Sequence, residues 1–314
     1  MLTPIEKIFF KNKPVGFLLR KSKHWYLPGF EGHSLFDVLQ TFYGQIKTQS
    51  MRERASAISY NFIMAIPPSL LFLFTLIPHL PFISSTSIKT QLHTFILDIV
   101  PSPQYNQEII RLVDSIIDGS KFGLLSFGLF LSLFFASNGI MGLMRSFNRK
   151  YAGFINRKSL RKRWLSIKIT VILFGLLLAY LLMLVMQGQL LKLLVESPTL
   201  REWIRYTRWG FMILLVYYAI AFIYRYAPAV YKKWKFLSPG TIVATTLCIL
   251  ASAVFTLFIK NFAQLNALYG SLGTVMMVMA LIYINSFALL IGFELNVSIN
   301  TLSRQRREAE KPAM

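Results

Sequence analysis

Two arginines and an asparagine follow one face of a predicted helix near the middle of the chain. Asn138, Gly142, Arg145 and Arg149 are spaced by four, three and four residues, so a helix places them close to one line along its surface. A guanidinium group can bind a phosphate or a carboxylate through two hydrogen bonds. We therefore predict that this stripe binds the anionic group of a substrate. The alternative is an anchor on lipid phosphates, because the basic residues of segment 157–163 continue the same charge.

A second candidate site is the pair Pro67-Pro68 in the middle of an apolar run. Two successive prolines remove two backbone donors from a helix and free the carbonyl groups four residues earlier. Inside a membrane such carbonyl groups need partners or a hydrated cavity, and transporters use interrupted helices to expose backbone to a substrate. Tyr60 and Asn61 lie nearby in the sequence, so these four residues predict a polar substrate pocket. A kink that only shapes helix packing is the alternative.

The last apolar run contains two asparagines and one acid, Asn285, Asn296 and Glu294. An acid inside a membrane-spanning helix is costly and is by default a functional candidate. We predict that Asn285 contributes to the substrate pocket. For Glu294, which lies near the end of the run, we favour a structural ion pair with Arg225 or Arg145. A role as a proton-coupling acid is the alternative.

Residue patterns typical of enzymes are missing from the sequence. The four histidines are scattered, so no two of them have the spacing of metal ligands, and the single cysteine, Cys248, excludes an intrachain disulfide. No glycine-rich phosphate loop or nucleophile elbow is present. We therefore predict a protein that is not an enzyme, uses no metal or cofactor and recognises no specific nucleic acid. Its net charge of +21 would attract RNA only non-specifically.

Long uncharged runs indicate how these residues are positioned. The chain is 54% hydrophobic over 314 residues, and six runs reach the roughly 20 apolar residues that a helix needs to cross a bilayer. Glycines such as Gly128 and Gly142 permit close helix packing, within one chain or between copies in a homo-oligomer. We predict an all-α, polytopic membrane domain over residues 57–298, with six transmembrane helices at 57–78, 122–144, 165–187, 209–227, 238–260 and 271–298.

The distribution of Lys and Arg predicts the orientation of the spans. Basic loops tend to stay in the cytoplasm. Both termini, including a basic tail over 299–314, are therefore predicted to be cytoplasmic. The counts that carry this prediction are nine, nine, four and four basic residues in segments 1–56, 145–168, 224–237 and 299–314, against three, four and one in the alternate segments 79–121, 188–208 and 260–270.

Two amphipathic regions lie outside the predicted spans. Within the N-terminal segment 1–56, residues 33–50 carry apolar side chains on one helical stripe, and Ser34 with Asp37 resembles a capping box. We predict a helix at the cytoplasmic surface of the membrane there. Segment 85–118 contains two apolar helical faces separated by Pro101 and Pro103. We predict an extracytoplasmic helical hairpin in this segment, between the first and second spans.

Several short motifs follow one another in a characteristic order along about residues 40–300. They are Arg54–Tyr60, Pro67-Pro68, Asn138–Tyr151, Tyr224-Arg225 with Pro228, Ser238–Gly240, Tyr269–Gly273 and Gly292–Asn296. Together they resemble the YihY/virulence factor BrkB family, once labelled ribonuclease BN. The resemblance implies a six-span protein of the bacterial inner membrane, linked to serum resistance and to export of envelope lipid or lipopolysaccharide. It also implies that the ribonuclease label is a misassignment.

The candidate residues and the resemblance favour a transporter or an envelope-lipid-handling protein that acts on an anionic or lipid-like substrate. Membrane lipids with anionic headgroups are the expected partners. The alternative is a non-transporting scaffold whose basic face recruits anionic lipid or an envelope partner. A ribonuclease is the least favoured hypothesis, because the segments predicted to be cytoplasmic contain no cluster of carboxylates or histidines that could hold a catalytic metal.

Overall fold

The computed structural model describes most of the chain as a bundle of helices. It covers residues 22–48, 50–76, 122–148, 157–194, 198–230, 233–261 and 271–310, with a few single positions between these ranges. Regular structure in these residues is helical, apart from one antiparallel bridge between Phe154 and Val230. The helices are α3 (Leu35–Thr48), α4 (Met51–Leu76), α7 (Phe122–Ala136), α8 (Asn138–Phe147), α9 (Ser159–Leu194), α10 (Pro198–Tyr226), α11 (Pro239–Asn261) and α13 (Ser271–Ala309).

Five helical segments are long and apolar enough to cross a membrane, when only the described residues are considered. They lie in α4, across α7 and α8, and in α9, α11 and α13, while α10 adds a shorter apolar segment, Gly210–Tyr226. Each of the six predicted spans falls largely on helix, although Ser137 interrupts the second. Several helices continue past the predicted limits, and α13 runs on to Ala309. The described chain is therefore an all-helical, multi-pass membrane protein.

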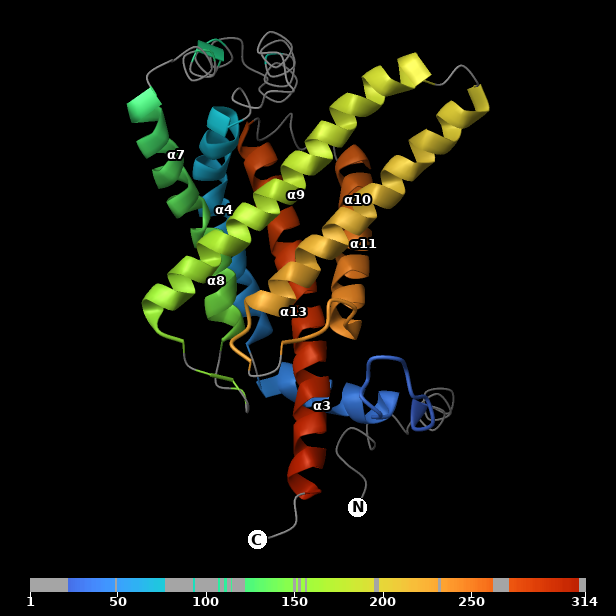
Figure 1. Cartoon of the computed structure of the whole chain (residues 1–314). Helices are drawn as coiled ribbons and strands as arrows, with labels where there is room; N and C mark the ends of the chain where they lie inside the picture. The colour runs from blue at the N-terminus through green and yellow to red at the C-terminus, as the bar shows by residue number, and fades with distance from the viewer. Residues whose placement is uncertain are drawn as a thin grey trace.

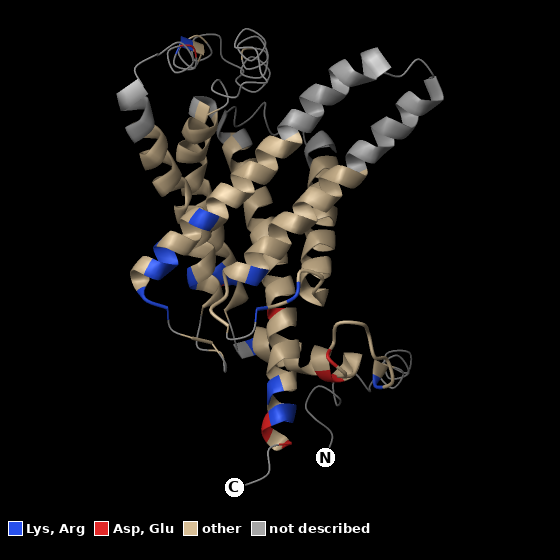
Figure 2. Cartoon of the chain, viewed as in Figure 1, with Lys and Arg blue, Asp and Glu red and all other residues tan. Residues whose placement is uncertain are grey.

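Helix α13 runs through the centre of the bundle and packs against α11, α4 and α3 (Figure 1). Helix α4 also packs against α7 and α8, while α9 and α10 contact each other and run at a slant in this view. The short α3 lies near the end of the bundle where α4 begins and α13 ends, and both termini are found there. Figure 2 shows that the Lys and Arg residues of α8, of the first part of α9 and of the end of α13 lie toward this end, which we call the basic end.

Two glycines allow α11 to pack closely on α13. A Cβ atom at Gly240 would lie 2.0 Å from the Gly292 carbonyl oxygen, and one at Gly292 would lie 2.3 Å from the Gly240 carbonyl oxygen. Asn296 of α13 accepts a hydrogen bond from the Gly240 amide (2.9 Å), and its side-chain amide donates to Ser238 Oγ (2.9 Å). The first of these bonds uses a backbone donor that the start of α11 leaves unpaired. Together they hold that helix end beside α13.

Helix α3 occupies most of the segment for which the sequence predicts an amphipathic helix. Ser34 Oγ accepts a hydrogen bond from the Asp37 amide (3.1 Å) and donates one to the Asp37 carboxylate (2.7 Å), so the two residues cap the helix as their spacing suggests. Val38 is fully buried, whereas Leu39 and Tyr43 are exposed. One face of α3 thus packs on α13, and the other carries apolar side chains outward.

Two features predicted from the sequence lie largely outside the described residues. The hairpin predicted over 85–118 is one of them, since only a few of its positions are described. Among those positions, His93 and Asp114 are both helical, and their Nε2 and Oδ1 atoms are 2.9 Å apart. The second feature is Arg149, the last member of the predicted arginine stripe.

Candidate functional site

A cavity of about 550 Å³ lies between α4, the junction of α7 with α8, α9 and α13. On α4 its lining extends from Phe62 to Leu73, which is about three helical turns. The lining is mainly apolar, with a few polar side chains among its residues, namely Ser69, Thr170, Asn285 and Ser286. Ligand sites in proteins have volumes of roughly 300–1,000 Å³ and combine apolar walls with a few polar groups. The cavity fits this description.

Arg163 of α9 holds the junction between α7 and α8 at the edge of the cavity. One of its guanidinium nitrogens donates to Asn138 Oδ1 and another to the Phe134 carbonyl, both at 2.6 Å. The guanidinium also lies 3.5 Å from the centre of the Phe134 ring, a cation–π contact. Arg163 therefore binds the last turn of α7 and the first residue of α8 at once. Gly139, the next residue of α8, lines the cavity.

A second asparagine–arginine contact joins α4 to α8. Arg145 Nη2 donates to Asn61 Oδ1 (3.1 Å), and Asn61 Nδ2 donates to the Ala57 carbonyl one turn earlier (2.6 Å). A Cβ atom at Gly142 would lie only 2.3 Å from Asn61 Cγ, so this glycine lets α8 approach Asn61. The side chain of Arg145 is exposed. Among the described contacts its other donors have no partner, whereas Arg163 uses two of its nitrogens on protein acceptors.

Helix α4 continues through Pro67-Pro68 without the interruption that the sequence suggested. Proline fits helical backbone angles although it donates no hydrogen bond, and Ser69 Oγ donates to the Ala65 carbonyl (2.6 Å) in the same turn. Pro67 is exposed and Pro68 is partly buried. Residues on either side of the pair, from Ala65 to Leu70, line the cavity. The prolines therefore lie in the cavity segment of α4, on its outer side.

Two adjacent polar residues of α13 line the cavity. Asn285 Nδ2 donates to the Leu281 carbonyl (3.0 Å) and lies 3.4 Å from Ser252 Oγ of α11. Ser286 is 1% exposed, and its hydroxyl has no hydrogen-bond partner within the described residues. An unpaired buried hydroxyl is unfavourable. Ser286 thus offers a donor to whatever occupies the cavity.

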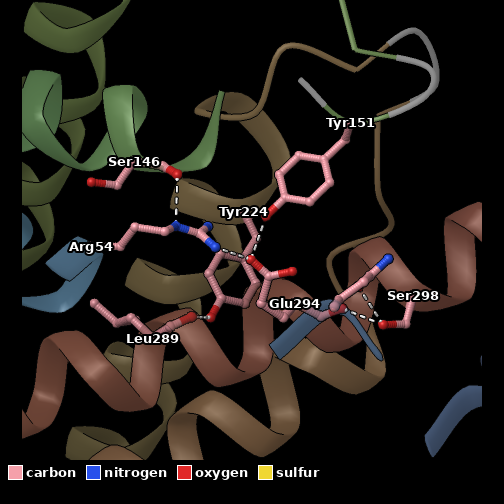
Figure 3. Close-up of polar contacts among 8 residues, drawn as sticks. Arg54, Ser146, Tyr151, Tyr224, Leu289, Glu294 and Ser298 are labelled. Atoms are coloured by element: carbon pink, nitrogen blue, oxygen red, sulfur yellow. Dashed lines mark hydrogen bonds and ion pairs between the residues drawn. The ribbon is translucent and has the colours of Figure 1, made fainter. Parts of the chain in front are cut away.

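The ion pair of Glu294 lies closer to the basic end, where its carboxylate contacts Arg54 and Tyr151 (Figure 3). Arg54 Nη1 donates to Glu294 Oε1, and Arg54 Nε donates to the Ser146 carbonyl (3.2 Å). The Tyr151 hydroxyl donates to the same carboxylate oxygen (2.5 Å). Arg54 and Glu294 are 1% and 0% exposed. Within the described residues, Arg54 Nη2 and Glu294 Oε2 have no partner, so one edge of the pair is left unsatisfied.

Aromatic side chains pack around this ion pair. The Phe147 and Phe293 rings are stacked with centroids 4.0 Å apart, and Tyr151, Tyr224 and Trp234 meet Phe293 at an angle. Tyr224 also donates to the Leu289 carbonyl of α13 (2.5 Å). We call these five residues the aromatic cluster. On α13 its member Phe293 follows the last cavity residue, Leu289, in the direction of the basic end, so the cluster packs the bundle on that side of the cavity.

The partner predicted for Glu294 was wrong. Its carboxylate pairs with Arg54, not with Arg225 or Arg145. Arg225 instead donates to the Trp234 carbonyl (3.4 Å) and lies over the Phe236 ring, because the segment between α10 and α11 folds against its guanidinium. Arg145 is directed to Asn61. The structural ion pair itself is present.

The structure brings some of the predicted substrate residues together and separates others. Asn61 contacts Arg145, and Asn138 lies next to Gly139 at the cavity. Asn285 lines the cavity directly. Tyr60 does not line it and is 60% exposed on the outside of α4. Of the predicted substrate residues, Asn285 thus lines the cavity, and Asn61 and Asn138 are each followed in the chain by a residue that lines it.

Sequence reasoning missed three residues of this region: Arg54, Arg163 and Ser286. Arg54 belongs to one of the family motifs, but the sequence suggested for it only a place in a basic cytoplasmic segment. Arg163 was likewise predicted only as part of the basic segment 157–163. The spacing of Arg54 did carry a signal, since it lies four residues before the buried Ile58 and thus on the same helical face. Ser286 had no comparable signal, because a serine in an apolar run is common.

Comparisons with known proteins agree with these motifs. The model of the family described as virulence factor BrkB matches residues 42–314. The putative ribonuclease-like protein YfkH of Bacillus subtilis is 26% identical over 283 residues, which cover 87% of this chain and 98% of that protein. The UPF0761 membrane protein IL2447 of Idiomarina loihiensis is 28% identical over 100 residues, covering 32% of this chain and 35% of that protein. No solved structure matches the chain. Because the family match covers most of its length, the chain belongs to the virulence factor BrkB family.

Proposed function

We propose that this protein is a membrane transporter or envelope-lipid-handling protein whose substrate carries an anionic group and an apolar part. One observation carries the proposal: the largely apolar cavity begins on α4 at Phe62, and the preceding residue, Asn61, accepts a hydrogen bond from Arg145, an exposed arginine with no other partner among the described contacts. An amphiphile would place its anionic group on that guanidinium and its apolar part among the cavity residues. Asn61 and Asn138 orient the arginines at this edge, Arg145 and Arg163.

The proposed orientation puts six helices across the bacterial inner membrane with the basic end in the cytoplasm. Its support is the positive charge at one end of the bundle, which matches the bias of cytoplasmic loops. The sixth span in this proposal is the apolar segment Gly210–Tyr226 of α10, and the polar first turns of that helix lie outside the span. In this arrangement α3 lies at the cytoplasmic surface, with its exposed Leu39 and Tyr43 toward lipid.

Hydrolysis of RNA is less well supported, although one relative carries a ribonuclease-like name. Metal-dependent nucleases hold their ions with clustered carboxylates and histidines. In the described part of the chain, no three such side chains gather. A scaffold without transport is the stronger competitor, since its basic face alone could recruit anionic lipid. The cavity is the feature that favours transport over this scaffold.

Reconstitution in liposomes tests the proposal. Protein would be inserted into vesicles that contain fluorescent anionic phospholipid, and movement between leaflets would be followed with a membrane-impermeant quencher. We expect protein-dependent movement that Arg145→Ala slows by about tenfold or more, because a hydrogen bond to a charged group contributes about 1.5–3 kcal/mol. Arg161→Ala is the matched control, since Arg161 is an exposed arginine of α9 at the same end. It should leave the rate nearly unchanged.

Two results of this experiment would contradict the proposal. If folded protein moves neither anionic lipids nor small anions, transport is excluded and the scaffold hypothesis takes its place. If Arg145→Ala and Arg161→Ala slow movement equally, the arginines act only through general surface charge. The specific site at Arg145 would then be wrong.

A further inference from the structure

Ser286 is the feature of the cavity that the proposed function does not yet explain. Its side chain is buried, and its hydroxyl is unpaired within the described residues. On α13 it lies about one turn from Ile282 and from Leu289, two apolar residues that also line the cavity. Most buried polar groups are paired. Ser286 is thus a cavity-lining residue whose hydroxyl, without a partner among the described residues, could donate to an acceptor on a ligand.

Ser286 and the Arg145 guanidinium lie at similar heights along the bundle. Arg54 and Glu294 contact each other and fix one common level of α4 and α13. From that level Asn61 lies seven residues along α4 and Ser286 eight residues back along α13, which correspond to about 10 Å and about 12 Å at 1.5 Å per residue. Because the Arg145 guanidinium contacts Asn61, it lies at nearly the same height as Ser286.

Beyond this level the cavity is mostly apolar, apart from Ser69, whose hydroxyl donates to the Ala65 carbonyl of its own helix. Its lining residues farther from the basic end are Leu70, Leu73, Leu177 and Leu281. On that side, Phe72 of α4 and Phe174 of α9 are stacked with ring centroids 4.8 Å apart. Ser286 thus lies nearer the basic end of the cavity, and the wall farther from that end is mostly apolar and includes an aromatic contact.

We propose that the cavity holds one acyl chain of a lipid and that the Ser286 hydroxyl donates to the carbonyl oxygen at the head of that chain. The anionic group of the same lipid would lie at Arg145, at a similar height. This inference rests on the proposed function and names its substrate class, an acyl-chain lipid with an anionic headgroup. A small anion would leave the apolar part of the cavity unused.

Photo-crosslinking tests the inference without requiring transport. The full chain would be placed in nanodiscs that contain an anionic phospholipid with a diazirine near the end of one acyl chain. After irradiation, adducts would be located by mass spectrometry. We expect them at Leu73, Leu177 and Leu281 in excess over Leu257 of α11, which is 60% exposed on the outside of the bundle. Adducts spread evenly over exposed apolar residues would overturn the inference.

Three variants test the role of the Ser286 hydroxyl separately from the role of the cavity space. Ser286→Ala should lower the yield of cavity adducts several-fold, because it removes the donor to the carbonyl oxygen. Thr256→Ala is the control, since it removes an exposed hydroxyl of α11 that bonds only within its own helix in the described contacts. Leu281→Trp should abolish cavity adducts by filling the space. An unchanged yield in Ser286→Ala would overturn the role of Ser286.

Crosslinking and transport measurements together distinguish a failure of the acyl-chain site from a failure of the transport proposal. Cavity adducts in a protein that moves no lipid would support the acyl-chain site and overturn transport. Movement of small anions without cavity adducts would overturn the acyl-chain site and leave transport intact.

Discussion

At the scale of single residues, the contact between Arg54 and Glu294 has a large desolvation cost, because it buries two charged side chains. Both side chains are almost fully buried, and each keeps one atom without a partner in the described residues. Burying two charges costs several kcal/mol for each ion, which their attraction offsets only with good geometry and further hydrogen bonds. Ser146 and Tyr151 supply such bonds. The pair therefore favours one arrangement of α4, α8 and α13.

Removing one member of the pair should destabilise the protein more than removing both. Glu294→Leu leaves Arg54 buried without its counter-ion, so we expect a loss of about 3–5 kcal/mol. The double variant Arg54→Met with Glu294→Leu should recover much of this loss. Thermal or denaturant unfolding in detergent measures both. Additive losses would show that the two charges do not interact.

Tyr151 should make stability depend on pH in the alkaline range. Burial, and next the charge of Glu294, raise the pKa of its phenol above the ordinary value of 10.0. The folded protein then holds this proton more tightly than the unfolded chain, so the contribution is complete below about pH 10 and falls as the pH rises further. We expect the stability difference between wild type and Tyr151→Phe to be constant up to about pH 10 and to shrink as the pH rises above that value toward the raised pKa of the folded protein. A constant difference would contradict the assignment.

At the scale of helices, the contact between α11 and α13 depends on the absence of side chains at Gly240 and Gly292. A Cβ atom at Gly292 would lie 2.3 Å from the Gly240 carbonyl oxygen, which is rigid backbone. We expect Gly292→Ala to cost about 1–3 kcal/mol or more, measured by unfolding in detergent. Gly175→Ala is the control, since nothing lies within 4 Å of its Cβ position. It should be neutral or slightly stabilising in α9, and similar losses in both variants would contradict the close packing.

Helices were easier to predict from the sequence than the contacts between them. Long apolar runs located the long helices because each run is a local pattern. The pairing of Glu294 with Arg54 depends on how α4 and α13 are rotated against each other, and no pattern within one helix contains that information. The same holds for Arg163, whose partners lie on α7 and α8. The interruption at Ser137 was missed because the apolar run continues through it.

At the scale of the whole molecule, charge and packing divide the bundle into two ends. The basic end combines the arginines and lysines with the aromatic cluster and the buried ion pair. The cavity lies beyond that packed region, and the exposed Arg145 contacts Asn61, the neighbour of the cavity residue Phe62. A ligand that reaches the cavity therefore approaches from the side of the bundle, where lipid would lie, more directly than through the packed basic end.

This division leads to a prediction about orientation. Single cysteines would be introduced into a Cys248→Ala background at Arg304, near the basic end, and at Asn261, the last residue of α11 at the opposite end. Because positive loops tend to stay in the cytoplasm, a membrane-impermeant thiol reagent should label Asn261→Cys in spheroplasts and Arg304→Cys only in inverted vesicles. The reverse pattern would place the basic end outside. Arg145 would then meet lipids of the outer leaflet, so the same experiment decides from which leaflet the proposed substrate enters.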